Sequence, residues 1–168
     1  FLDPWSDPYD SGFQLTQSLI AIGRGEVGGV GLGGSVQKLF YLPEAHTDFV
    51  FAVFAEEFGL LGVVILVALY GVLVWRIMSV SSRCAGAGAL FPACLTFGLG
   101  AWLGAQAIVN IGVNMGLLPT KGLTLPLMSF GGSSLITCCA AIGIILRADL
   151  EQRRLANRPK GRARRVRA

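Results

Sequence analysis

The sequence predicts an all-α, polytopic membrane protein, and three observations support this fold class. Hydrophobic residues make up 53% of the chain and charged residues only 14%, a balance that suits a lipid environment better than water. The run 58–75 carries no charge and reaches the length of about 18 apolar residues that a spanning helix needs. Two further apolar stretches follow it, and the charges are concentrated between the stretches and at the C-terminus.

The first predicted element is a polar, glycine-rich loop that covers residues 1–47. Within it, Leu15, Leu19 and Ile22 recur at helical spacing, which predicts a short amphipathic helix, either at the membrane interface or on the protein surface. The run 23–35 matches the G-x-G-x-x-G pattern, but no predicted strand precedes it, so it does not indicate a dinucleotide site. Its glycines instead allow the backbone to turn tightly and to approach a neighbour or a ligand closely.

Three spanning helices are predicted next, separated by short polar segments. The first is longer than a bilayer core of about 30 Å, so its first turns should protrude or be sheltered by protein. In the second, small residues permit close helix packing, and the amides of Gln106 and Asn110 can bond across helices. The predicted boundaries are 48–78 for the first span, 79–89 for a turn, 90–113 for the second span, 114–126 for a loop, 127–147 for the third span and 148–168 for a basic tail.

The basic residues are distributed unevenly, and this predicts the orientation in the membrane. Eleven of the 14 Lys and Arg residues lie between Arg76 and Arg83 or at and beyond Arg147, whereas three lie in the other two loops. By the positive-inside rule, the turn and the tail are cytoplasmic. The loop before the first span and the loop after the second span then face outward. The tail has no interleaved aromatic residues and follows a membrane span, so we expect no nucleic-acid partner.

The four cysteines do not indicate a metal site or a disulfide framework. They show neither C-x-x-C spacing nor a pairing with the single histidine, His46. We therefore expect all four to be small buried hydrophobic side chains. The sequence specifies no cofactor; a divalent cation is compatible with it, but no motif indicates one.

The chemistry is expected where the stretch Tyr-Leu-Pro-Glu-Ala-His-Thr-Asp-Phe at 41–49 leads into the first span. Its proline fixes φ, and Thr47 or Asp48 then stands where a side chain satisfies the free N–H groups of a helix start. Asp48 also lies at the membrane boundary, where a carboxylate faces water on one side and protein or lipid on the other. Two roles for it stay open from these residues, a helix cap and a catalytic base.

Cationic and small residues near the same surface are candidate contacts for an anionic substrate. Lys38 and Lys121 come from the two outward loops. The third span opens with Pro-x-x-Ser-x-Gly-Gly-Ser-Ser, whose N–H groups and helix dipole can face an anion, although the pattern also fits a tight helix-packing face. The candidate residues in this motif are Ser129, Gly131, Gly132 and Ser133.

Four motifs, taken in order, resemble the SEDS family (shape, elongation, division and sporulation). They are Gln-Leu-Thr-Gln-Ser-Leu-Ile-Ala-Ile-Gly at 14–23, Gly-Leu-Gly-Gly-Ser-Val-Gln-Lys at 31–38, Leu-Pro-Glu-Ala-His-Thr-Asp-Phe at 42–49 and Pro-x-x-Ser-x-Gly-Gly-Ser-Ser at 126–134. The resemblance covers nearly the whole chain up to Arg147. The chain departs from the family at Val27-Gly28, where an aromatic pair is usual, and at Phe130, where tyrosine is common.

The resemblance implies the last three transmembrane helices and a large extracytoplasmic loop of a SEDS fold of roughly ten helices, so we expect this chain to be the C-terminal part of a longer protein. It implies a peptidoglycan glycosyltransferase of the bacterial inner membrane that polymerises lipid II, an undecaprenyl-pyrophosphate-linked disaccharide pentapeptide, at the division septum. The implied partners are a class B penicillin-binding transpeptidase and other divisome proteins. The family's catalytic carboxylate corresponds to Asp48.

Two functions of other classes are also compatible with the sequence. A transporter or lipid II flippase would use broken helices around a site at the membrane midplane. The residues expected at the midplane are uncharged, however, whereas Asp48 lies at the outward end of its span. A non-catalytic divisome scaffold would not depend on Asp48.

Overall fold

The computed structural model describes residues 13–34, 48–119 and 122–156, and over these residues the regular secondary structure is all α-helix. Three of its helices are long and apolar enough to cross a membrane, so this is a multi-pass membrane protein, as the composition predicted. The helices are α1 (Phe13–Arg24), α3 (Val50–Gly86), α4 (Leu90–Asn114) and α5 (Gly132–Ala156).

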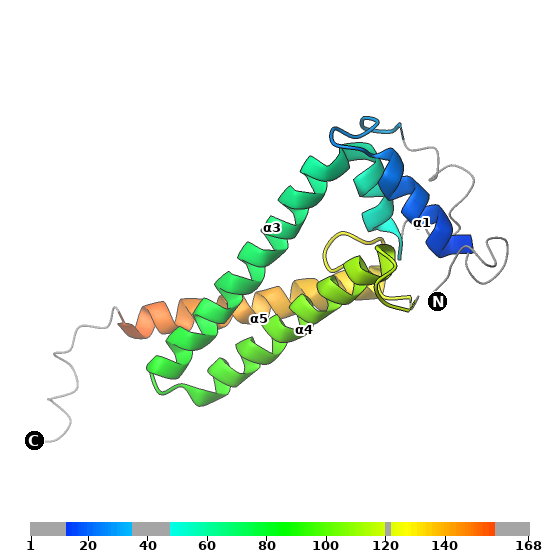
Figure 1. The fold of residues 1–168 in the computed structure, drawn as a ribbon. Helices are drawn as coiled ribbons and strands as arrows, with labels where there is room; N and C mark the ends of the chain where they lie inside the picture. The colour runs from blue at the N-terminus through cyan, green and yellow to red at the C-terminus, as the bar shows by residue number, and fades with distance from the viewer. Residues whose placement is uncertain (1–12, 35–47, 120–121, 157–168) are drawn as a thin grey trace, which may run out of the picture.

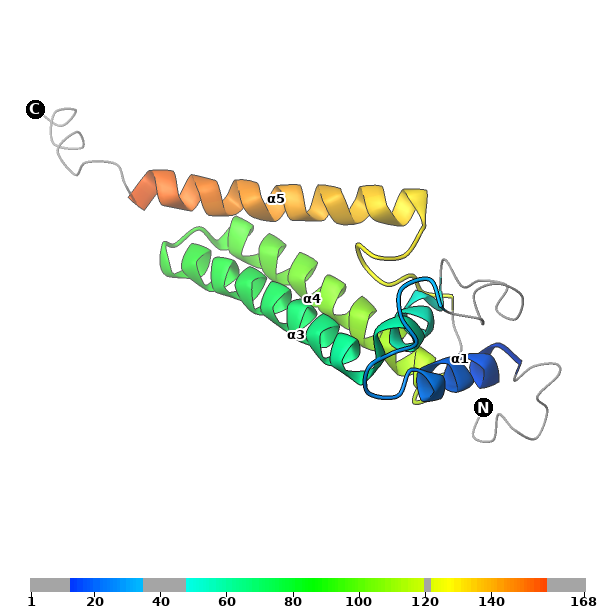
Figure 2. The ribbon, with the colours of Figure 1, turned by 90° about the horizontal axis from the view of Figure 1, so that it is seen from above.

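The helices α3 and α4 form an antiparallel hairpin, and α5 lies across this pair (Figures 1 and 2). One buried cluster joins the three helices; its members are Ile77, Leu103, Cys138 and Ile145. Close packing of α3 on α4 depends on small residues, because a Cβ added to Gly100 would lie 2.6 Å from Cγ2 of Ile77. The expectation that glycines in the second span permit close helix packing is therefore confirmed.

The first span is longer than the sequence indicated, since α3 continues eight residues past the predicted end at 78. The polar run that we assigned to a turn from 79 to 89 is helical, and the connection to α4 spans only 87–89. Ser79 and Ser82 stay in the helix by donating to the carbonyls four residues earlier, at 2.8 and 2.9 Å. Ser81 donates instead to the Ala93 carbonyl of α4 at 2.8 Å, which fastens the end of the hairpin.

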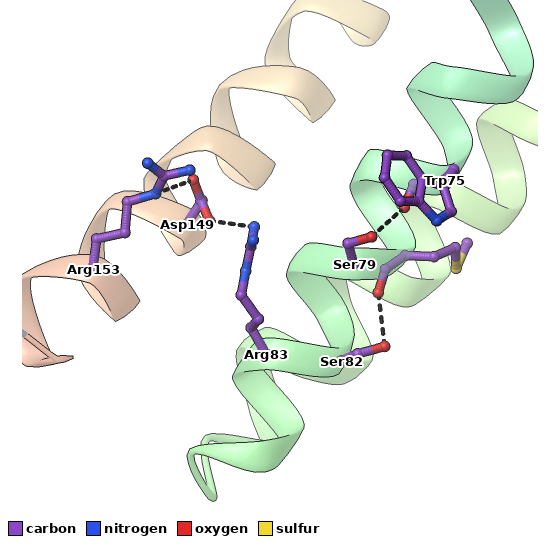
Figure 3. Close-up of polar contacts among 7 residues, drawn as sticks. Trp75, Ser79, Ser82, Arg83, Asp149 and Arg153 are labelled. Atoms are coloured by element: carbon purple, nitrogen blue, oxygen red, sulfur yellow. Dashed lines mark hydrogen bonds and ion pairs between the residues drawn. The ribbon is translucent and has the colours of Figure 1, made fainter.

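The third span is displaced toward the C-terminus by comparison with the predicted 127–147. Residues 125–131 form turns, with Leu127 at a positive φ of 64°, and α5 begins only at Gly132. At its other end α5 continues past Arg147, because Asp149 forms ion pairs at 2.8 Å with both Arg83 of α3 and Arg153 of its own helix (Figure 3). The basic tail therefore begins after the helix and not at 148.

The helix α3 is broken at Gly59, whose φ of 65° and ψ of −163° only glycine adopts readily. In an unbroken helix the amides of Leu60 and Leu61 would bond the carbonyls of residues 56 and 57. The glycine-rich loop satisfies all four groups instead. Leu60 N donates to Glu26 O at 2.9 Å, Leu61 N to Val27 O at 3.3 Å, Val30 N to Glu56 O at 3.0 Å and Gly31 N to Glu57 O at 3.1 Å.

The break divides α3 into a short first part and a segment, 60–86, that is about 40 Å long and can cross a bilayer unaided. The first part turns away beside α1, and the glycine-rich loop lies over the bend (Figure 1). Phe51, Ala52 and Ala55 are buried there. Of the two expected arrangements, in which the first turns protrude or are sheltered by protein, the structure shows shelter.

The predicted amphipathic helix is present as α1, and it packs mainly on α3 with a smaller contact to α4. Leu15 is buried in this contact, as the pattern indicated. Ser18 is also buried although its side chain is polar, and it donates to the Asn114 carbonyl at 2.9 Å. The helix therefore presents both apolar and polar side chains to the rest of the protein.

Candidate active site at Asp48

Asp48 lies two residues before α3 and beside the end of α4. The N-cap position belongs to Phe49, which makes no capping hydrogen bond through its side chain. The Asp48 side chain is half-buried and takes part in polar interactions. The N-cap position is therefore one residue after Asp48, and the choice between a capping role and a catalytic role for the Asp48 carboxylate stays a prediction.

Two asparagines of α4 hold the main chain of Asp48. The side-chain amide of Asn110 donates to the Asp48 carbonyl at 3.0 Å, and that of Asn114 donates to the same oxygen at 3.1 Å. Both asparagines are almost completely buried. Asn114 also donates to the main-chain carbonyl of Asn110 at 3.0 Å, one helical turn away, which fixes the orientation of its amide.

The loop after α4 meets Asp48 directly. A Cβ added to Gly122 would lie 2.8 Å from Oδ2 of Asp48, so this glycine leaves room for the carboxylate. The same loop is fastened to α4, because Asn110 donates to the Leu123 carbonyl and Gln106 donates to the Thr124 carbonyl at 2.9 Å. The predicted convergence of two outward loops is therefore present in the described residues at Asp48 and Gly122.

The start of α5 is joined to this loop by hydroxyl groups. Thr124 Oγ1 and Ser134 Oγ are 2.8 Å apart. Ser129 is buried, and its hydroxyl accepts a hydrogen bond from the Leu125 amide at 2.7 Å, which closes the turn before the helix. Ser129 thus shapes the turn, and direct contact with a substrate stays a prediction.

The other residues of this motif occupy the first turn of α5. Gly132 and Ser133 are exposed, and Gly131 comes immediately before the helix. The first N–H groups of a helix have no partner within it, so this end can direct donors and a positive dipole outward. Whether these residues bind a substrate stays a prediction.

The two predicted lysines, Lys38 and Lys121, lie outside the described residues. Within the described residues, no group of three or more His, Cys, Asp and Glu side chains could hold a metal ion. Cys84 and Cys138 are buried, as expected, whereas Cys94 and Cys139 are exposed, so the expectation of buried side chains is wrong for these two in the described residues.

The sequence indicated a bonding role for the amide of Asn110 but named no partner for it. We expected its amide to bond across helices, and it bonds the backbone of Asp48 and of the loop. Asn114 was not noticed as part of a site. The available signal was the spacing of these two asparagines, which places both on one face of α4 beside the outward loop.

Comparison with known proteins places the chain in a family. The FtsW/RodA/SpoVE family model, described as "Cell cycle protein", matches residues 1–154. The chain belongs to the FtsW/RodA/SpoVE family. The resemblance read from the four motifs is thus confirmed.

Relatives in the FtsW/RodA/SpoVE family are similar over most of this chain. A protein of Thioalkalivibrio sulfidiphilus named "Probable peptidoglycan glycosyltransferase FtsW" is 64% identical over 151 residues, covering 90% of this chain and 38% of the relative. A protein of Alkalilimnicola ehrlichii with the same name is 62% identical over 164 residues, covering 98% of this chain and 41% of the relative. The chain thus spans about two fifths of the length of these relatives.

A solved structure is also similar in fold. A chain from the work "Structural coordination of polymerization and crosslinking by a peptidoglycan synthase complex" superposes with a TM-score of 0.69 at 38% sequence identity. The match covers 90% of this chain and 40% of that chain. The helices described above therefore occur in the same arrangement in an experimentally solved member of a synthase complex.

Proposed function

We propose that this chain carries the catalytic base of a peptidoglycan glycosyltransferase that polymerises lipid II into glycan strands. One observation carries the proposal: Asp48 is held by α4 against the loop that leads into α5, so its half-buried carboxylate lies beside that loop at Gly122. Relatives named as peptidoglycan glycosyltransferases share 62–64% identity with this chain and support the same activity.

The reaction needs a group that removes a proton and groups that stabilise negative charge. The acceptor sugar loses a hydroxyl proton, and an undecaprenyl pyrophosphate leaves as an anion. Asp48 is the proposed base, and a positioned base contributes roughly 10²- to 10⁴-fold to a rate. Lys38, Lys121 and the donors at the start of α5, Gly131 to Ser133, are the proposed contacts for the pyrophosphate.

The break in α3 is also compatible with a second function, transport, because transporters use discontinuous helices as well. The break in this chain differs in one respect. All four freed backbone groups are bonded by the glycine-rich loop, so none of them lines an ion path. Polymerisation is therefore the better account of the site, and a lipid II flippase is the alternative that the experiment below separates from it.

The proposed setting is the bacterial inner membrane at the division septum. In this setting the end that carries Asp48 faces outward, because Arg76, Arg83, Arg153 and Arg154 lie in the later parts of α3 and α5. These parts of the two helices lie at the end of the molecule away from α1 (Figure 1). The proposed partners are a class B penicillin-binding transpeptidase and other divisome proteins. The similarity to a chain of a solved synthase complex supports a partner of the first kind.

The test uses the full-length protein, purified and reconstituted in vesicles with labelled lipid II, with and without the transpeptidase. We expect glycan polymer on gels, in larger amounts when the partner is present. Movement of lipid II across the vesicle membrane without any polymer would favour the flippase. Neither polymer nor movement in either arm, with a protein shown to be folded, would favour the scaffold.

A further inference from the structure

The strongest unexplained feature of the site is the pair of buried amides on α4. Asn110 is 2% exposed and Asn114 is completely buried. Burying polar groups is costly unless each is hydrogen-bonded, and here the bonds run to main-chain carbonyls of distant segments. Such an arrangement fixes those segments relative to each other.

Asn110 joins the two segments that make the site. Its amide nitrogen donates one hydrogen bond to the carbonyl of Asp48 and one to the carbonyl of Leu123. The position of the Asn110 side chain that faces these two carbonyl oxygens must hold the NH₂ group and not the amide oxygen, so the side-chain amide has only one consistent orientation. Both protons of this amide are used in holding the Asp48 peptide beside the loop that contains Gly122.

Asn114 supports this arrangement from one turn further along α4. It donates to the Asp48 carbonyl and to the Asn110 carbonyl, and its own carbonyl accepts from Ser18 of α1. The pair therefore connects α1, α4, the segment before α3 and the loop before α5. A connected, buried polar network of this kind favours one arrangement strongly over others.

We propose that Asn110 and Asn114 are positioning residues that set the place of the Asp48 carboxylate relative to the loop at Gly122 and the start of α5. The inference rests on the proposed function, since it assigns what holds the base of that reaction. Both amides act on the main chain of Asp48, through its carbonyl oxygen. A shift of about 1 Å at a reacting group can lower a rate by about 100-fold, so loss of the hydrogen bonds from Asn110 and Asn114 to Asp48 should lower turnover.

The test compares Asn110→Ala with Thr96→Ala in the full-length protein. Thr96 is a matched control, because it is buried on the same helix and bonds only carbonyls of its own turn, at Pro92 and Ala93. We expect Asn110→Ala to lower kcat for lipid II polymerisation by about 10- to 100-fold, with KM changed less than about threefold. Thr96→Ala should change kcat by less than about twofold at a similar melting temperature.

Variants made in a protein that already carries Asp48→Asn distinguish a failure of this inference from a failure of the proposed function. In a protein that carries Asp48→Asn, the further change Asn110→Ala should lower the residual rate less than about twofold. The effects of substitutions at residues that act as a unit are not additive. If Asp48→Asn alone keeps full activity, the proposed function is wrong. If Asp48→Asn is inactive while Asn110→Ala behaves like Thr96→Ala, only the positioning role is wrong.

The conservative variant Asn110→Ser covers the case in which Asn110→Ala does not fold. A hydroxyl donates one hydrogen bond where the amide donates two. We expect kcat of this variant to lie between that of the wild type and that of a protein without the Asn110 hydrogen bonds. Its melting temperature should be unchanged within about 2 °C. Full kcat for a folded Asn110→Ser protein would overturn the positioning role.

Discussion

Gly59 and Gly25 meet backbone to backbone, since a Cβ on Gly59 would lie 2.7 Å from the carbonyl oxygen of Gly25. This contact brings the glycine-rich loop into the break in α3, where the loop bonds the freed amides of Leu60 and Leu61. The loop is therefore a structural part of the first span and not a flexible linker. It also keeps the short first part of α3, which follows Asp48, in its bent position.

We predict that Gly59→Ala destabilises the full-length protein. Alanine at this φ and ψ costs roughly 1–3 kcal/mol, and its methyl group would also press on the carbonyls of Gly25 and Val27. Thermal unfolding in detergent should show a lower melting temperature. Gly71→Ala is the matched control, because Gly71 is helical and nothing lies within 4 Å of an added Cβ. Equal melting temperatures for the two variants would mean that the break is not held as described.

The space at Gly122 leads to a prediction for activity. Gly122→Ala adds a methyl group 2.8 Å from Oδ2 of Asp48, which must move. We expect polymerisation to fall by about tenfold or more, because the base is displaced, while the melting temperature changes little. The control is Gly98→Ala on α4, where the added group meets open space. Full activity of a folded Gly122→Ala protein would show that the position of the carboxylate is not critical.

The sequence predicted the fold class well, and the physical reasons are local. Apolar length determines the existence of the three spans, and the second span, predicted at 90–113, is observed as Leu90–Asn114. The predicted helix boundaries are wrong where contacts with residues distant in the sequence determine how far a helix extends. Ser81 remains helical because it bonds Ala93 of the next helix, and α5 extends because Asp149 joins Arg83.

The break in α3 could not be predicted from its own residues. Gly59, Gly62 and Gly71 lie in the same apolar run, and composition does not distinguish them. Only Gly59 has a loop beside it that supplies four backbone hydrogen bonds, and that loop is about 30 residues earlier in the chain. Asn110 is a similar case, since its partner Asp48 is 62 positions away in the sequence. Sequence patterns show that such groups are polar, and the fold determines what they bond.

The orientation in the membrane can be tested by labelling cysteines. The four native cysteines are first replaced with alanine, and single cysteines are then placed at two exposed positions, Met115 and Ala87. We expect a reagent that cannot cross membranes to label Met115→Cys in intact cells, and Ala87→Cys only after permeabilisation. The opposite pattern would place Asp48 on the cytoplasmic side and would exclude polymerisation on the outer face.

The catalytic role of Asp48 is the central claim, and the change Asp48→Asn tests it most directly. Asparagine keeps the shape of the side chain and leaves the main-chain carbonyl free to accept from Asn110 and Asn114, but it cannot serve as a base. The measurement is the initial rate of lipid II polymerisation by the full-length protein with its transpeptidase, alongside melting temperature and partner binding. We predict a loss of about 100-fold or more in rate with unchanged melting and binding. A near-normal rate for this variant would contradict the assignment of Asp48 as the catalytic base.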